Sequence, residues 1–276
     1  TENSRPNEVL ASAKVVSAQG EVNALDAAGQ RRRLVDGGSI YPGDTVETGA
    51  GTRATLDAIS CLVPLERFEV PTGTQVFDWD VPREWNIRDA WIKNAAGEKV
   101  VDFQRHSLHV MSYSPPNRAR MQLAELKPHL FSLPDNPSWI PYRTSYYRDN
   151  WGFCLAHDAL QALPDGEYEV CIDSTLAPGS LSYGEAFLPG DSSDEILIWT
   201  HVCHPSLAND NLSAISVAAH LARSVAARPR RFSYRFVFAP TTIGAITWLA
   251  RNESRVGLVR HGLVLASLGD RGSFVY

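Results

Sequence analysis

The sequence lacks several features that would point to particular classes of protein. In its 276 residues no run approaches the roughly 20 apolar residues of a membrane-spanning helix. The formal net charge is −5 at pH 7, so no overall positive field favours nucleic acid or anionic lipid. The four cysteines form neither a CxxC pair nor a small-protein disulfide pattern. We therefore expect reduced thiols, a cytoplasmic address, no membrane span and no nucleic-acid partner.

The N-terminal segment, residues 1–57, differs in composition from the rest. It contains one aromatic residue (Tyr41) and no cysteine, and its short β-like runs are separated by turn residues. It has no signal peptide and no initiator methionine, so we expect a trimmed start. The stretch GGSIYPGDTVETGAGTRATL resembles part of a FecR-type domain, a small β-module of bacterial envelope and signalling proteins. That resemblance covers residues 11–56 and implies a periplasmic address; the alternative is that residues 1–57 are disordered.

The second half of the chain alternates predicted strands with predicted helices. Its strands are rich in β-branched and aromatic residues, and its helices carry apolar residues three and four positions apart. This β-α-β-α-β order predicts a parallel sheet with right-handed crossovers. We expect strands at 166–176, 195–202, 232–240 and 261–269, and helices at 211–227 and 242–253.

Candidate metal ligands gather where these strands end. His201, His204 and Asp210 lie within ten residues, at the end of one strand and the start of the next helix. Imidazole and carboxylate groups are suitable ligands for Zn²⁺ and related ions. Asp270 follows the last strand, and because parallel strand ends share one edge, we expect it to join the same ion. The alternative is that Asp210 caps the helix and the histidines bond neighbouring loops.

Four long motifs occur in order from about residue 48 to the end. They are EVPTGTQVFDWDVPREWNIRDAWI, WIPYRTSYYRDNWGFCL, THVCHPSLANDNLS and YRFVFAPTTIGAITWLARNE. Together they resemble a bacterial aminopeptidase-like family that is related to the co-catalytic zinc aminopeptidases. The resemblance implies an α/β, phosphorylase/hydrolase-like fold, with a mostly parallel sheet and helices on both faces. It also implies a β-rich domain at 64–150, inserted into an α/β domain formed by 58–63 and 151–276.

The same resemblance implies roles for the candidate ligands. His201 matches the histidine that ends a strand in the zinc aminopeptidases, and Asp210 matches the aspartate that bridges two zinc ions. Asp270 matches a later aspartate more weakly. His204 belongs to the family's HxCHPS motif, as a ligand or as a group that supports one. One or two zinc ions and a peptide or small-molecule substrate are therefore expected.

Two departures from the family pattern limit this expectation. Thr241 and Thr242 stand where the peptidases carry a pair of glutamates, one of which is the general base, and a threonine hydroxyl does not take up a proton near pH 7. The chain also ends at Tyr276, so we expect a fragment or a shortened form without a complete two-zinc site. Glu185 is the candidate substitute base, with Asp173 a weaker one. Both have a structural alternative, as turn or salt-bridge residues.

Three functions are compatible with this pattern. The first is a zinc-dependent, aminopeptidase-like hydrolase of peptide or amide bonds. The second is a non-catalytic module that binds an amine, a peptide or a glycan. The third is an envelope-associated scaffold built on the FecR-like segment. Since the sheet would end in an exposed edge strand, we also expect the chain to associate with itself.

Overall fold

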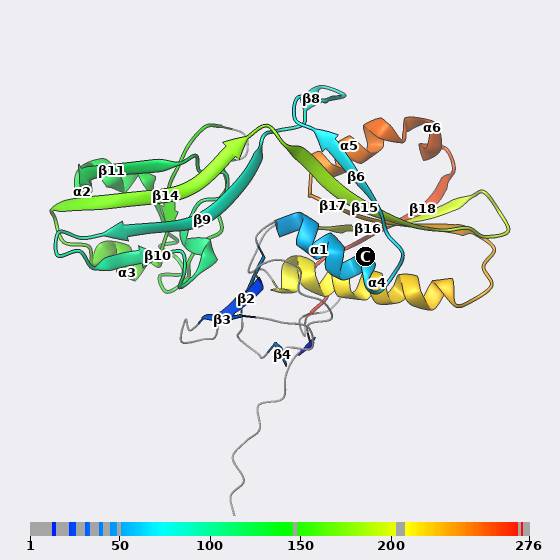
Figure 1. Cartoon of the computed structure of the whole chain (residues 1–276), viewed down its shortest axis with the longest axis horizontal. Helices are drawn as coiled ribbons and strands as arrows, with labels where there is room; N and C mark the ends of the chain where they lie inside the picture. Colours follow the sequence, from blue (N-terminus) through cyan, green and yellow to red (C-terminus); the bar gives the residue numbers. More distant parts are fainter. Residues whose placement is uncertain are drawn as a thin grey trace, which may run out of the picture. The chain divides into compact units, whose positions relative to one another are not determined.

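The computed structural model describes residues 13–14, 22–25, 31–33, 39–40, 45–48, 51–145, 148–202, 208–269 and 272. The chain divides into two units, which Figure 1 draws in sequence colours. We call residues 70–181 the inserted unit and residues 1–69 with 182–276 the α/β unit. Among the described residues, no helix combines the length and apolarity needed to cross a bilayer.

The α/β unit is built on a mixed five-stranded sheet. Its strand order is β18 (Val259–Leu265), β16 (Glu195–His201), β17 (Ser233–Ala239), β15 (Ser180–Leu188) and β6 (Glu66–Pro71). Strand β16 runs parallel to β17 and β18, whereas β15 runs antiparallel to β17. The sheet is therefore mixed: three strands are parallel, as expected, and β15, which the sequence did not predict as a strand, is antiparallel to β17. Only residues 189–194 connect β15 to β16, and so short a link cannot hold the crossover that a parallel arrangement requires.

Alternating side chains of this sheet face two different layers. On β17, Phe236 and Phe238 join a core with the helices α1 (Gly51–Ser60) and α4 (Ser213–Ala226). Val237 and its row point to the other face, where Trp248 of α5 (Ile243–Arg251) packs edge-on against Trp199. Figure 1 shows α1 and α4 on one side of the sheet and α5 with α6 (Glu253–Val256) on the other. Helices thus cover both faces, as expected.

The inserted unit centres on an antiparallel sheet. Its order is β10 (Lys99–Asp102), β9 (Glu84–Lys93), β14 (Glu167–Ala177) and β11 (Asn117–Gln122). Strand β14 pairs antiparallel with both β9 and β11, so its expected place at the start of the parallel series is wrong. The physical reason is its period of two: Tyr168, Val170 and Ile172 are buried and alternate with more exposed polar residues, which is typical of a sheet with one covered face.

Shorter elements complete the inserted unit. They are β7 (Gln75–Val76), β8 (Trp79–Asp80), η1 (Ser107–His109), α2 (Leu123–Leu126), η2 (Lys127–His129), β12 (Leu130–Phe131), β13 (Phe153–Cys154) and α3 (His157–Gln161). All its helices have five residues or fewer, in agreement with the proline-rich sequence.

Short strands form within the N-terminal segment. β2 (Val22–Leu25) pairs antiparallel with β3 (Arg31–Arg33) and β5 (Thr45–Thr48), and β1 (Ala13–Lys14) pairs with β4 (Ser39–Ile40). Helix α1 runs across the predicted domain boundary at residue 57, because Leu56 and Ile59 both belong to the core of the α/β unit. Residues 51–60 are therefore part of that unit's packing.

Candidate functional site at the carboxyl rim of the parallel strands

The three parallel strands of the α/β unit end side by side. His201, the last residue of β16, lies opposite Ala239 of β17, and Thr200 lies opposite Leu265 of β18. The loops that follow these strands therefore leave from one edge of the sheet, where open α/β sheets bind ligands. We call this edge the carboxyl rim.

At the carboxyl rim, the structure brings together two of the four predicted metal ligands. His201 is held by β16, and Asp210 lies in the π-helical turn η3 (Ala208–Leu212) that leads into α4. Nε2 of His201 is 3.4 Å from Oδ1 of Asp210, and the two side chains are 12% and 40% exposed. The other two predicted ligands, His204 and Asp270, lie outside the described residues.

The geometry of this pair fits a shared zinc ion. Bonds of about 2.0 to 2.1 Å in a tetrahedral arrangement place two ligand atoms about 3.3 Å apart. The observed separation of 3.4 Å between His201 Nε2 and Asp210 Oδ1 is close to that value. Within the described ranges, no set of three or more histidine, cysteine, aspartate or glutamate side chains is grouped for metal binding. The described part of the chain therefore brings together two side chains that are suitable as zinc ligands.

The turn after β18 is bonded to the turn that carries Asp210. Three successive backbone N–H groups donate to it: Ser267 to the carbonyl of Asp210 (3.1 Å), Leu268 to Oγ of Ser213 (2.9 Å) and Gly269 to Oδ1 of Asn209 (2.6 Å). The sequence predicted Asp210 in this stretch as a metal ligand, or alternatively as a helix cap, but it did not predict these contacts. The signal that it offers is the run of short polar side chains in ANDNLS, each able to accept a backbone hydrogen bond.

The turn after β17 carries the two threonines that replace the expected glutamates. Thr241 and Thr242 are both exposed. Thr242 has φ 56° and ψ −81°, a region that a β-branched residue rarely adopts. Ser267, after β18, also has a positive φ of 53°. Two of the three strand ends thus hold a strained non-glycine residue, and such residues cluster at functional sites in proteins.

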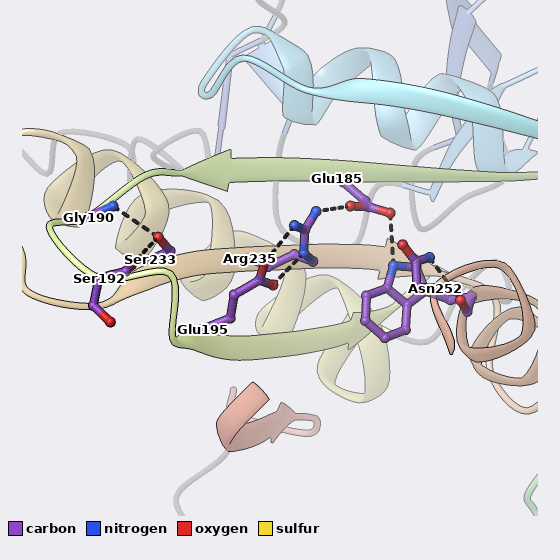
Figure 2. Close-up of polar contacts among 8 residues, drawn as sticks. Glu185, Gly190, Ser192, Glu195, Ser233, Arg235 and Asn252 are labelled. Atoms are coloured by element: carbon purple, nitrogen blue, oxygen red, sulfur yellow. Dashed lines mark hydrogen bonds and ion pairs between the residues drawn. The ribbon is translucent and has the colours of Figure 1, made fainter. Parts of the chain in front are cut away.

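Glu185, the candidate substitute base, has both carboxylate oxygens occupied. It is 5% exposed in the middle of β15, where one oxygen accepts a hydrogen bond from Nη1 of Arg235 (2.5 Å) and the other from Nε1 of Trp248 (2.8 Å). Arg235 also donates two hydrogen bonds to Glu195, of 2.7 and 2.9 Å. Figure 2 shows Arg235 between the two carboxylates. We call Glu185, Arg235, Glu195 and Trp248 the buried ion network.

Glu185 also lies away from the carboxyl rim. It is paired with Val237, which in turn is paired with Trp199, two residues before His201. With about 4.8 Å between strands and about 3.3 Å per residue, the backbones at 185 and 201 are about 12 Å apart. The structural alternative, a salt-bridge residue, therefore describes its contacts. Asp173 lies in the inserted unit, where a hydrogen bond from Arg88 lowers the pKa of its carboxyl group.

The comparisons with known proteins place this architecture among aminopeptidase-like α/β proteins. Residues 38–276 match the family described as "Domain of unknown function (DUF4910)", and the chain belongs to that family. The match includes residues 45–57, which both the FecR-type resemblance and the aminopeptidase-like resemblance cover. No comparison supports the FecR-type resemblance.

One relative and one solved structure come from Clostridium acetobutylicum. The relative, a "Putative polysaccharide biosynthesis protein with aminopeptidase-like domain", is 48% identical over 250 residues, which are 91% of this chain and 57% of the relative. The crystal structure, of a "putative peptidase", is 51% identical with a TM-score of 0.79, over 82% of this chain and 53% of that chain. The chain thus spans little more than half the length of these relatives.

The similarity to a more distantly related structure concerns the fold alone. The zinc aminopeptidase BSAP from Bacillus subtilis matches with a TM-score of 0.53 and 13% identity, over 80% of this chain and 64% of that chain. The mixed α/β fold of the chain is therefore similar to that of a zinc aminopeptidase.

Proposed function

We propose that this protein is a zinc-dependent, aminopeptidase-like hydrolase of peptide or amide bonds. The observation that carries the proposal is the approach of His201 Nε2 and Asp210 Oδ1 to 3.4 Å at the carboxyl rim. In this proposal these two residues are ligands, and His204 and Asp270 complete the set. When bound, zinc would supply Lewis-acid polarisation of an amide carbonyl.

The residues of the chain would contribute orientation more than proton transfer. β16 fixes His201 at the end of a strand that lies between β17 and β18, and η3 fixes Asp210 opposite it. Thr241 offers a hydroxyl at the position of the general base, and this group can bind a substrate but does not remove a proton near pH 7. Hydrolysis by this protein therefore needs a proton acceptor other than Thr241.

A second function is favoured by the two threonines: binding of an amine, a peptide or a glycan without cleavage. Thr241 and Thr242 leave the turn after β17 without a carboxylate. Among these ligands, a glycan is supported by the name of the Clostridium relative, which refers to polysaccharide biosynthesis. In this case zinc would serve to hold the ligand.

Zinc titration tests the metal site that both functions share. We expect the wild-type chain to bind zinc, and His201→Ala or Asp210→Ala to weaken that binding by about 100-fold or more, because removal of groups that only support a ligand already costs 10- to 100-fold. The matched control is His220→Ala, on the exposed face of α4, which should bind as the wild type does. A wild-type chain that takes up no zinc would contradict the proposal.

Turnover then separates the two functions. The zinc-loaded chain is incubated with aminoacyl reporters, and its melting temperature is measured with amines, peptides and glycans. Release of the reporter that is lost in His201→Ala supports the hydrolase. A ligand-dependent rise in melting temperature without turnover supports the binding module. If the reporter is not released and the melting temperature does not rise with any ligand, both functions are contradicted.

A further inference from the structure

We infer that Asn209 and Ser213 are positioning residues, which brace the turn carrying Asp210 so that its carboxylate faces His201. This inference rests on the proposed metal site and identifies what holds it in place. It concerns the turn at 267–269 and the stretch 209–213, all within the described residues. We call the hydrogen bonds between them the brace.

The turn that carries Asp210 is held by hydrogen bonds additional to those of its helical backbone. Its backbone is π-helical over Ala208–Leu212, a rare conformation that occurs mostly as single turns and is frequent at functional sites. Its carbonyls at 209 and 210 accept hydrogen bonds from a side chain and from another turn: Oγ of Ser213 donates to Asn209 (2.5 Å), and N–H of Ser267 donates to Asp210 (3.1 Å). Contacts with neighbouring groups thus stabilise this turn.

The turn after β18 is shaped to provide that support. Ser267 has a φ of 53°, and backbone turns through the left-handed region direct successive N–H groups toward one concave side. Here three such groups meet three oxygens, from Asp210, Ser213 and Asn209. In other proteins such a set of N–H groups can bind an anion. Here the three groups donate to oxygen atoms of the chain itself.

Ser213 links the two turns through a single hydroxyl. Its Oγ donates to the carbonyl of Asn209 and accepts from N–H of Leu268 (2.9 Å). Gly269 fits closely beside it, since an added Cβ would lie 3.0 Å from both Asn209 Oδ1 and Ser213 Cβ. The two turns are therefore in direct contact, and loss of either side chain would free Asp210 to move from His201.

The alternative is that Asn209 and Ser213 only stabilise the start of α4. A stabilising role of that kind lowers the melting temperature but leaves the zinc affinity of the folded protein unchanged. The brace predicts a different result, because a misplaced ligand weakens metal binding even when the fold is intact. Zinc affinity therefore distinguishes the two roles.

The experiment compares Ser213→Ala with Ser213→Thr, which retains the hydroxyl, and with Ser216→Ala, an exposed serine of the same helix. Zinc affinity is measured by competition with a chromogenic chelator, and amide hydrogen exchange is followed at 267–269. We expect Ser213→Ala to lose about 10-fold or more in zinc affinity, together with protection of these amides. Ser213→Thr should recover most of both, and Ser216→Ala should change neither.

Asn209→Ala provides a second variant if Ser213→Ala fails to fold, with the same expected losses. Unchanged zinc affinity in the folded variant overturns the brace, whatever the exchange shows. Equal losses in Ser216→Ala also overturn it. A wild-type chain that binds no zinc would instead overturn the proposed function, and this role with it, so the two failures are distinguishable.

Discussion

At the scale of single residues, the surroundings of a side chain decide the chemistry open to it. The carboxylates of Glu185 and Asp210 belong to the same unit, but their partners differ. Glu185 is buried against Arg235 and Trp248, whereas the part-exposed Asp210 faces His201. A buried carboxylate with both oxygens bonded acts as a structural group, whereas a part-exposed one beside an imidazole is of the kind that the proposed metal site requires.

The cysteines allow a direct test of this effect of burial. Burial raises the pKa of the Cys154 thiol to about 12, and its side chain has no exposed surface. Cys61 is exposed. Since the thiolate is the reactive form, we expect iodoacetamide at pH 7.5 to alkylate Cys61 more than about a thousandfold faster than Cys154, as followed by peptide mass mapping.

Unfolding provides the control for that experiment. In concentrated urea both thiols should react at similar rates, because the difference comes from the folded environment. Alkylation of Cys154 in the folded chain at a rate close to that of Cys61 would show that the β13 region opens readily, and would contradict the burial of Cys154.

At the scale of secondary-structure elements, the buried ion network makes the stability of the sheet depend on one arginine, Arg235. Arg235 is paired with two carboxylates, and all three side chains are 4 to 5% exposed. Removing one partner of a buried pair leaves charges without compensation, which costs about 3 to 5 kcal/mol. We therefore expect Arg235→Ala to lose about that much free energy of unfolding, measured by urea denaturation.

Arg260 offers a matched control one strand away from the network. It donates a hydrogen bond of 2.9 Å to Asp194, but both side chains are at least one-third exposed. Exposed pairs contribute about 0 to 1 kcal/mol, so Arg260→Ala should change stability little. Similar losses in the two variants would mean that the network contributes no more than a surface pair.

The elements also show which parts of the structure could be predicted from the sequence. The end of β16, helix α4 and the proximity of His201 to Asp210 follow from local patterns, because the two residues are close along the chain. The place of β14 could not be predicted in the same way, since pairing with β9 and β11 joins distant segments. The partners of Glu185 could not be predicted from the sequence either, because Arg235 and Trp248 are 50 and 63 residues further along the chain.

At the scale of the whole molecule, the α/β unit has an exposed sheet edge. Among the described strands, β18 pairs only with β16. Leu263 and Val264, at the centre of β18, are 48% and 70% exposed. An apolar edge strand with free hydrogen-bonding groups is a template for pairing with another chain.

We expect the 276-residue chain to associate through β18 as its concentration rises. Val264→Lys should reduce this association, because a charged side chain on an edge strand opposes pairing. The control is Val217→Lys, which adds the same charge to the exposed face of α4, where Val217 is 44% exposed. Light scattering over a range of concentrations measures the average mass. A wild-type chain that stays monomeric at high concentration, or an equal effect of Val217→Lys, would show that β18 is not the contact.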